Sequence, residues 1–273
     1  MSVRLLVLDI DGTLLDPAGK LTAATVAAVR AAVAFGCVVT LATGRRFRTA
    51  KPIADALGLE LPILVQNGAL IKDSLTGEIL YHRHLSCAGA AVAIEYLWEA
   101  GAQPIVYENA FVGDQVYTGP VERDTPVNAA YFARNAEYQR RSTMQELVPG
   151  EPPLEVSTVD DAARLRALAP GLIHPGFRVI TTTYSSGAGF LEVLEARCSK
   201  AEALYELARR LDLPIQQTMA IGDNLNDLEL LMAAGVGVAM GNAKPEVQAI
   251  ARYVTASNAD DGVAEAIGRF VLR

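Results

Sequence analysis

Two aspartates separated by one residue stand directly after an apolar segment near the start of the chain. The segment Val3 to Leu8 is followed by Asp9, Ile10 and Asp11. A nearly uninterrupted apolar run is typical of a strand in a parallel sheet that is covered on both faces. Because side chains alternate along a strand, Asp9 and Asp11 are predicted to lie on the same side. Two carboxylates that close repel each other, so we expect a cation or a shared proton between them.

The next residues, Gly12 and Thr13, are suited to a sharp turn. Gly12 lets the chain reverse and offers a bare backbone N–H to an anion. Asp-Gly-Thr is also the composition of an ordinary turn after a strand. An ordinary turn, however, explains neither the paired acids nor three further polar segments of the chain.

The second segment is Thr43, Gly44 and Arg45, which follows the apolar stretch Cys37–Leu41 and is expected to open a helix. A hydroxyl group and bare N–H groups at a helix N-terminus bind phosphate oxygens well. Taken alone, this segment fits a structural turn equally well.

The third segment is Ser199 and Lys200, at the start of another predicted helix. Ser199 and Glu202 have the spacing of a capping box, which places Lys200 at the first helical position. A positive charge is unfavourable there because of the helix dipole, and a nearby anion would remove the conflict. A solvated surface lysine is the alternative interpretation.

The fourth segment runs from Gly222 to Asp227, directly after an apolar strand that ends at Ile221. Four of its six residues are polar, and such residues do not pack into a core without partners. Asp223 is expected to leave its strand as Asp9 leaves its own. Carboxylates, carbonyls and water are the ligands that Mg²⁺ favours, so this segment predicts a share in a metal site. A plain turn is again the alternative.

The composition limits the class of protein. The chain has 273 residues, of which 51% are hydrophobic and 20% charged, enough for a large core and for two domains. A net charge of -7 argues against a nucleic-acid partner but allows a small phosphate ester. Three cysteines without metal-type spacing, no leader sequence and no membrane-length apolar run predict a cytoplasmic protein with no membrane partner.

Strands and helices alternate at both ends of the chain, which is typical of a parallel α/β sheet. We expect helices over residues 21–35, 46–57, 199–211 and 227–234, and strands over Cys37–Leu41, Ile63–Val65, Thr218–Ile221 and Val236–Met240. From about Tyr81 to Glu195 the pattern becomes that of an inserted α+β domain with a largely antiparallel sheet. Its strands are expected at Ile105–Tyr107, Phe111–Val116, Leu154–Val159 and Phe177–Thr183, and its helices near Cys87–Ala100, Val127–Asn135 and Asp160–Leu168.

The four segments, in this order, resemble those of the haloacid dehalogenase superfamily, and within it the Cof-type phosphatases with a large α+β cap. The resemblance covers the whole chain, and the segments at Asn67-Gly68 and Val238–Ala243 are also similar to family segments. One departure is Ala201, where the family usually has glycine after the lysine. The resemblance implies an α/β fold: a Rossmann-like parallel-sheet core of residues 1–82 plus 196–273, split by a cap of residues 83–195.

The resemblance also implies roles for individual residues. Asp9 would be the nucleophile that forms an aspartyl phosphate, and Asp11 the general acid and base. The phosphate-binding groups would be Gly12, Thr43, Gly44, Arg45, Lys200 and Asn226. Mg²⁺ would be bound by the side chains of Asp9 and Asp223 and the backbone carbonyl of Asp11, with Asp227 orienting these ligands.

These roles describe a Mg²⁺-dependent phosphomonoesterase that acts on a small phosphorylated metabolite. Sugar phosphates, pyridoxal phosphate and flavin mononucleotide all fit similar proteins, and the sequence does not choose among them. A sugar phosphomutase and a catalytically silent phosphate-binding protein remain as alternatives. The oligomeric state is also left open by the sequence.

Overall fold

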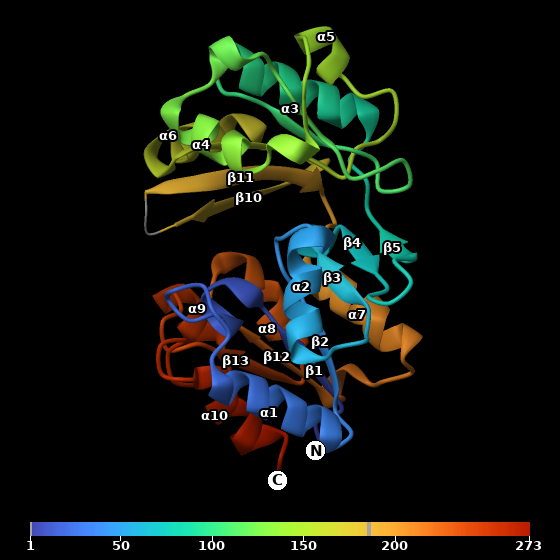
Figure 1. The fold of residues 1–273 in the computed structure, drawn as a ribbon, viewed down its shortest axis with the longest axis vertical. Helices are drawn as coiled ribbons and strands as arrows, with labels where there is room; N and C mark the ends of the chain where they lie inside the picture. The colour runs from blue at the N-terminus through green and yellow to red at the C-terminus, as the bar shows by residue number, and fades with distance from the viewer. Residues whose placement is uncertain (1, 185–186) are drawn as a thin grey trace. The chain divides into compact units, whose positions relative to one another are not determined.

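The computed structural model describes residues 2–184 and 187–273. These residues form two compact units, one made of Met1–His82 with Ser199–Arg273 and the other of Arg83–Cys198 (Figure 1). The second crossing between the units therefore falls at Cys198, three residues after the position expected from the sequence. Within the described ranges, no helix has the length and apolar character needed to cross a membrane.

The first unit, which we call the core unit, is built on a parallel sheet. Its strands are β1 (Leu5–Leu8), β2 (Val38–Leu41), β12 (Thr218–Gly222), β13 (Val236–Ala239) and β14 (Tyr253–Val254). They lie in the order β14-β13-β12-β1-β2, and every pairing is parallel. All four residues of β1 are fully buried. The apolar composition of β1 thus follows from its central place in a sheet with helices on both faces.

Helices flank this sheet. They are α1 (Ala23–Ala34), α2 (Phe47–Leu57), α7 (Lys200–Arg210), α8 (Leu228–Ala233), α9 (Pro245–Ile250) and α10 (Gly262–Phe270). Helix α1 packs against α10, and α7 packs against α8 (Figure 1). The Thr22 hydroxyl accepts a hydrogen bond from the Thr25 N–H, and Gly58 ends α2 in a left-handed conformation. The first is an ordinary threonine N-cap, and the second is a C-terminal glycine in the conformation that glycine adopts most easily.

The third predicted strand of the core differs from expectation. Strand β3 (Ile63–Val65) meets the parallel sheet through a parallel bridge between Ala42 and Leu64 and a hydrogen bond from the Thr43 N–H to the Leu64 carbonyl, not through a full strand pairing. It instead pairs antiparallel with β4 (Leu70–Lys72), which pairs antiparallel with β5 (Ile79–His82). The reason is a turn over Gln66–Gly68 that reverses the chain at once.

The second unit, which we call the inserted unit, has a six-stranded sheet with one parallel pair. Its strands are β6 (Ile105–Tyr107), β7 (Val116–Thr118), β8 (Gln139–Arg141), β9 (Glu155–Asp161), β10 (Phe177–Thr183) and β11 (Ala188–Glu195). Their order is β10-β11-β9-β6-β7-β8, and only β7 and β8 run parallel. The predicted α+β insertion with a largely antiparallel sheet is therefore confirmed.

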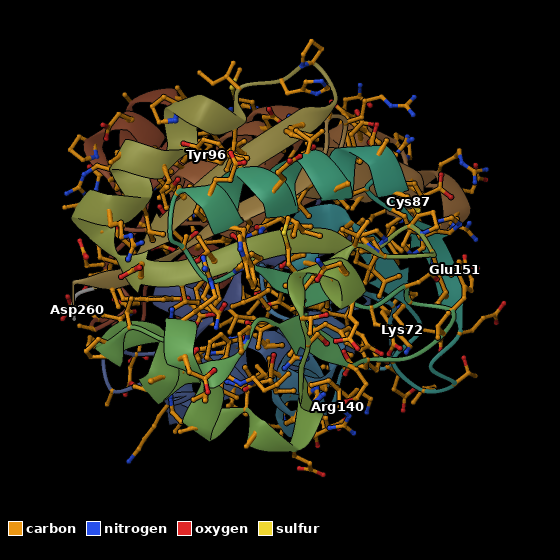
Figure 2. The ribbon with its side chains drawn as sticks, turned by 90° about the horizontal axis from the view of Figure 1, so that it is seen from above. Lys72, Cys87, Tyr96, Arg140, Glu151 and Asp260 are labelled. Atoms are coloured by element: carbon orange, nitrogen blue, oxygen red, sulfur yellow. The ribbon has the colours of Figure 1, made fainter. Side chains whose placement is uncertain are left out.

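The helices of the inserted unit are α3 (Cys87–Glu99), α4 (Pro126–Arg134), α5 (Met144–Leu147) and α6 (Ala162–Leu168). Figure 2 shows α3 with Cys87 near one end and Tyr96 near the other. Helices α3 and α6 share one apolar core with β6, β9 and β11. The Tyr96 hydroxyl joins this packing by donating a hydrogen bond to the Leu168 carbonyl, at 2.9 Å.

One prediction for the inserted unit was wrong. Phe111–Val116 is not a strand, because Asn109 closes a turn in which Phe111 and Val112 are exposed, and β7 begins only at Val116. The helix expected near Asp160–Leu168 is confirmed, and it begins at Ala162 because Asp160 and Asp161 still belong to β9. The Asp161 carboxylate then caps that helix by accepting two backbone N–H groups.

Candidate active site

Three strands deliver the predicted site residues to one edge of the parallel sheet. The register pairs Leu8 with Ile221 on one side and with Leu41 on the other. Asp9 and Asp223 therefore leave neighbouring strands at their carboxyl ends, and the loop that starts at Thr43 leaves the third. Ligands of open α/β sheets bind at this edge.

Asp9 and Lys200 form the buried centre of the site. The Lys200 ammonium is fully buried and lies 2.6 Å from Asp9 Oδ1 and 2.6 Å from Asp227 Oδ1. The anions that accommodate a lysine at the first position of α7 are thus two carboxylates of the protein itself. The sequence predicted an anion at this place but assigned it to a phosphate.

Asp227 connects Lys200 to the backbone of the loop that carries Asp223. Its second oxygen, Oδ2, accepts the backbone N–H groups of Asp223 and Asn224, each at 3.1 Å. Gly222 makes room for it, because a Cβ at Gly222 would lie 2.5 Å from the Asp227 carboxyl carbon. Both oxygens of Asp227 therefore have protein partners.

Asp223 completes a group of three carboxylates. One carboxylate oxygen from each of Asp9, Asp223 and Asp227 lies within 4.8 Å of the other two. Thr13 Oγ1 donates to Asp223 Oδ1 at 3.1 Å. Three carboxylates and one ammonium give this cluster a net charge of -2 when all four groups are ionised. A divalent cation would balance that charge.

The pKa values of these groups are shifted by burial and by the excess of negative charge in the cluster. Burial raises the pKa of Asp9 well above its ordinary value; the Lys200 charge opposes this, and Asp227 and Asp223 add to it. Burial, followed by the Asp227 charge, raises the pKa of Asp223 to about 7. Burial alone would lower the pKa of Lys200, but Asp227 and Asp9 outweigh it and raise that pKa. Two carboxylates thus favour a proton or a metal ion, while Lys200 stays charged.

The turn after β1 requires glycine at position 12 for steric reasons. Its φ is +83°, and a Cβ would lie 2.3 Å from Asp223 Oδ2. Its carbonyl accepts a hydrogen bond from Asn242 Nδ2 at 2.8 Å. Any larger residue at position 12 would therefore displace Asp223. Asn242 lies in the segment Val238–Ala243, which resembles a family segment, but its residue type alone predicts no role for it.

Asp11 lies in a different environment from Asp9. Strand β1 ends at Leu8, and residues 10–14 form a turn, so the predicted alternation of Asp9 and Asp11 along one strand is wrong. The Asp11 side chain is 51% exposed, and its two oxygens accept hydrogen bonds from Arg45 at 2.6 and 2.5 Å. Arg45, expected on phosphate, thus pairs with Asp11 in this structure.

The loop of Thr43 and Gly44 lies beside Asn67. The helix that it was expected to open, α2, begins only at Phe47. Thr43 is buried, and its hydroxyl accepts the Arg45 N–H at 3.1 Å. Asn226 is brought to the same place, since its Nδ2 donates to Asn67 Oδ1 at 2.8 Å. Sequence reasoning gave no role to Asn67; its only signal was the Asn-Gly pair that it forms with Gly68.

Comparisons with known proteins agree with this geometry. The family described as haloacid dehalogenase-like hydrolase matches residues 6–267. The pyridoxal phosphate phosphatase YbhA of Escherichia coli (strain K12) is 28% identical, over 98% of this chain and 98% of its own length. An HMP-PP phosphatase of Serratia proteamaculans (strain 568) is 30% identical, over 90% of this chain and 87% of its own.

A solved structure shows the same fold. The crystal structure of a haloacid dehalogenase-like hydrolase from Bacteroides thetaiotaomicron has a TM-score of 0.81 and 28% sequence identity. The match covers 98% of this chain and 99% of that one, so it includes the inserted unit. The chain therefore belongs to the haloacid dehalogenase-like hydrolase family and is a phosphatase, an enzyme that hydrolyses phosphate esters.

Proposed function

We propose that this protein is a Mg²⁺-dependent phosphomonoesterase that hydrolyses a small phosphorylated metabolite through an aspartyl-phosphate intermediate. The observation that carries the proposal is the Lys200 ammonium 2.6 Å from Asp9, inside a cluster of three carboxylates. The Lys200 charge opposes the effect of burial on the Asp9 pKa, and a bound divalent cation would favour the carboxylate further, so an ionised nucleophile would be available without a separate base.

The reaction has two steps. An Asp9 oxygen attacks phosphorus while the bond from phosphorus to the leaving oxygen breaks, and Asp11 donates the proton that this oxygen needs. In the second step Asp11 takes a proton from water, the water oxygen attacks the same phosphorus, and Asp9 is released. The exposure of Asp11 supports this role, because its side chain can exchange protons with solvent. Its pairing with Arg45 must open for the first step.

The cluster fits Mg²⁺ by its donors and its charge. Oxygen ligands and a net charge of -2 suit a hard divalent cation, which would favour the ionised forms of Asp9 and Asp223 against the burial that raises their pKa values. Asp9 and Asp223 would bind the metal through their side chains and Asp11 through its carbonyl. Asp227, with both oxygens engaged, would orient Asp223. When bound, the ion reduces the repulsion between Asp9 and the anionic ester.

The remaining predicted groups would hold the phosphoryl oxygens. We assign them this role because they lie in the segments after β1, β2 and β12 and at the start of α7, and supply hydroxyl, backbone, amide and ammonium donors. They are Gly12, Thr43, Gly44, Lys200 and Asn226. Arg45 is proposed to reach the phosphate only after it leaves Asp11.

The inserted unit, Arg83–Cys198, which contains the cap expected over residues 83–195, is proposed to select the leaving group. Its own sheet and apolar core support a separate function. Cys37, Cys87 and Cys198 are all free thiols, and an odd number of free cysteines supports a reducing compartment such as the cytoplasm. The proposed substrate class is a small metabolite, in line with a net charge of -7 that disfavours nucleic acid.

The test is a screen of phosphorylated metabolites with purified protein, with Mg²⁺ and with a chelator. We expect inorganic phosphate to be released in proportion to the alcohol formed, and the rate to fall to background with chelator. An isomerised sugar phosphate without free phosphate would indicate the phosphomutase instead. No reaction with any ester in the presence of Mg²⁺ would favour the silent phosphate-binding protein.

A further inference from the structure

The turn that reverses the chain after β3 has an unusual backbone. Its φ angles are +47° at Gln66, +53° at Asn67 and +90° at Gly68. Glycine adopts this left-handed region freely, whereas other residues do so at a cost. Among the described residues, Asp212 and Asp261 are the other non-glycine residues with positive φ, and they are isolated. Two successive strained residues call for an explanation in what they hold.

The turn is buried and is tied to the Thr43 loop. Gln66 is 3% exposed and Asn67 is 1% exposed. The Gln66 N–H donates to the Arg45 carbonyl, and the Asn67 N–H donates to the Thr43 carbonyl, both at 3.0 Å. The left-handed conformation thus lets two successive N–H groups fix the carbonyls on either side of Gly44.

The same turn also meets the start of α7. A Cβ on Gly68 would lie 2.2 Å from the Ser199 carbonyl oxygen and 3.0 Å from the Lys200 nitrogen. The backbone at Gly68 therefore packs directly on the residues that begin α7. The turn connects two of the segments that the sequence had singled out.

The Asn67 side chain makes the third connection. Its Oδ1 accepts from Asn226 Nδ2 at 2.8 Å. A Cβ on Gly44 would come within 3.3 Å of both polar atoms of the Asn67 amide, so Gly44 packs against that amide. Because the NH₂ group of Asn226 is planar, a bond to one of its N–H groups also sets the direction of the other.

We propose that Asn67 is a positioning residue, which aims the second N–H of Asn226 and supports Gly44 from behind. This inference rests on the proposed function, in which Asn226 and Gly44 hold phosphate. It accounts for the residue type. Glycine would fit the backbone but supply no acceptor, and alanine would supply neither. Asparagine is among the side chains that tolerate the left-handed region best, and it carries the amide.

The test separates the side chain from the backbone by comparing Asn67→Gly with Asn67→Ala. Both variants lose the amide, but only alanine conflicts with a φ of +53°. Hydrolysis of p-nitrophenyl phosphate with Mg²⁺ and thermal melting are measured for each. We expect kcat/KM to fall about tenfold or more, and by a similar factor, in both variants. We expect Tm to fall clearly only in Asn67→Ala.

Two further variants make the test specific. Asp212 follows the end of α7 and, like Asn67, has a positive φ, of +52°. Asp212→Gly removes the strain of that conformation and should leave kcat/KM unchanged. The double variant Asn67→Gly with Asn226→Ala should lose less activity than the product of the two single losses, because part of the effect of Asn67 passes through Asn226.

The outcomes are distinct. An active wild type with an equally active Asn67→Gly would overturn this inference, as would activity losses that follow Tm across the variants or that add in the double variant. An inactive wild type would instead overturn the proposed function, because the comparison among variants needs a phosphatase to start from.

Discussion

Asp9 and Asp11 are two residues apart in the chain and lie in opposite environments. Asp9 is buried beside the fully buried Lys200, in a cluster where burial raises the pKa of two acids. Asp11 is 51% exposed and pairs with Arg45, which is 30% exposed. Water and salt screen the exposed pair, so such a pair contributes at most about 1 kcal/mol to stability. The buried cluster, in contrast, has charges that only each other or a metal ion can compensate.

The comparison makes the change at Asp9 the one with the largest effect. We expect Asp9→Asn to reduce kcat by about 1,000-fold or more, because the amide is a far poorer nucleophile than the carboxylate. The fold should persist, since the substitution keeps the shape and lowers the negative charge of the cluster. Turnover of p-nitrophenyl phosphate and a thermal melt in chelator check both parts. Wild-type-like hydrolysis by this variant would refute the assigned nucleophile.

The second prediction removes the only cation of the cluster. Lys200→Met keeps the length of the side chain but leaves three buried or half-buried carboxylates without their ammonium. We expect a loss on the order of 3 kcal/mol in the free energy of unfolding without metal, and near-complete loss of activity. Urea unfolding measures the first effect. Unchanged stability would mean that the carboxylates simply take up protons.

The third prediction concerns pH and metal. Asp223 has a pKa of about 7 in the folded protein and about 4 in the unfolded chain, so the folded protein binds more protons between these values. In the metal-free protein, the contribution of Asp223 to stability is therefore complete below pH 4 and is lost as pH rises through 7. We expect Mg²⁺ to raise Tm more at pH 8 than at pH 5.5. Asp223→Asn is the control, in which the Mg²⁺ effect should be small at both values.

The smallest effect is expected at the exposed pair. Arg45→Ala should change the free energy of unfolding by less than about 1 kcal/mol, and the change should shrink as salt is added. Its effect on kcat should be far below that of Asp9→Asn. A destabilisation by Arg45→Ala as large as that of Lys200→Met would show that exposure does not distinguish the two regions.

The sequence was sufficient to predict the segments that form the site. The apolar run that ends at Leu8 favoured a strand covered on both faces, and the polar stretch after Ile221 could not pack into a core without partners. With both strands in one parallel sheet, Asp9 and Asp223 were expected to meet, and their carboxylates lie within 4.8 Å. These predictions succeeded because the apolar or polar character of consecutive residues indicates which strands are buried and where they end.

Other features depended on backbone geometry that residue types do not specify. The turn at Gln66 and Asn67 reverses the chain through positive φ values at two non-glycine residues, so β3 could not be recognised as the first strand of a small antiparallel sheet. The end of β1 at Leu8, not two residues later, decided that Asp11 faces Arg45. Strand β14 has two residues and carries no periodic pattern.

The place of β1 between β2 and β12 affects the folding of the enzyme during its synthesis. During synthesis Asp9 is added more than two hundred residues before its neighbours Asp223 and Asp227. At typical synthesis rates this delay is roughly 10 to 45 s. Meanwhile the growing polypeptide exposes one open edge of an apolar strand, while the contiguous insertion can already complete its own sheet. A nascent chain of this kind is vulnerable to aggregation until β12 emerges and pairs with β1.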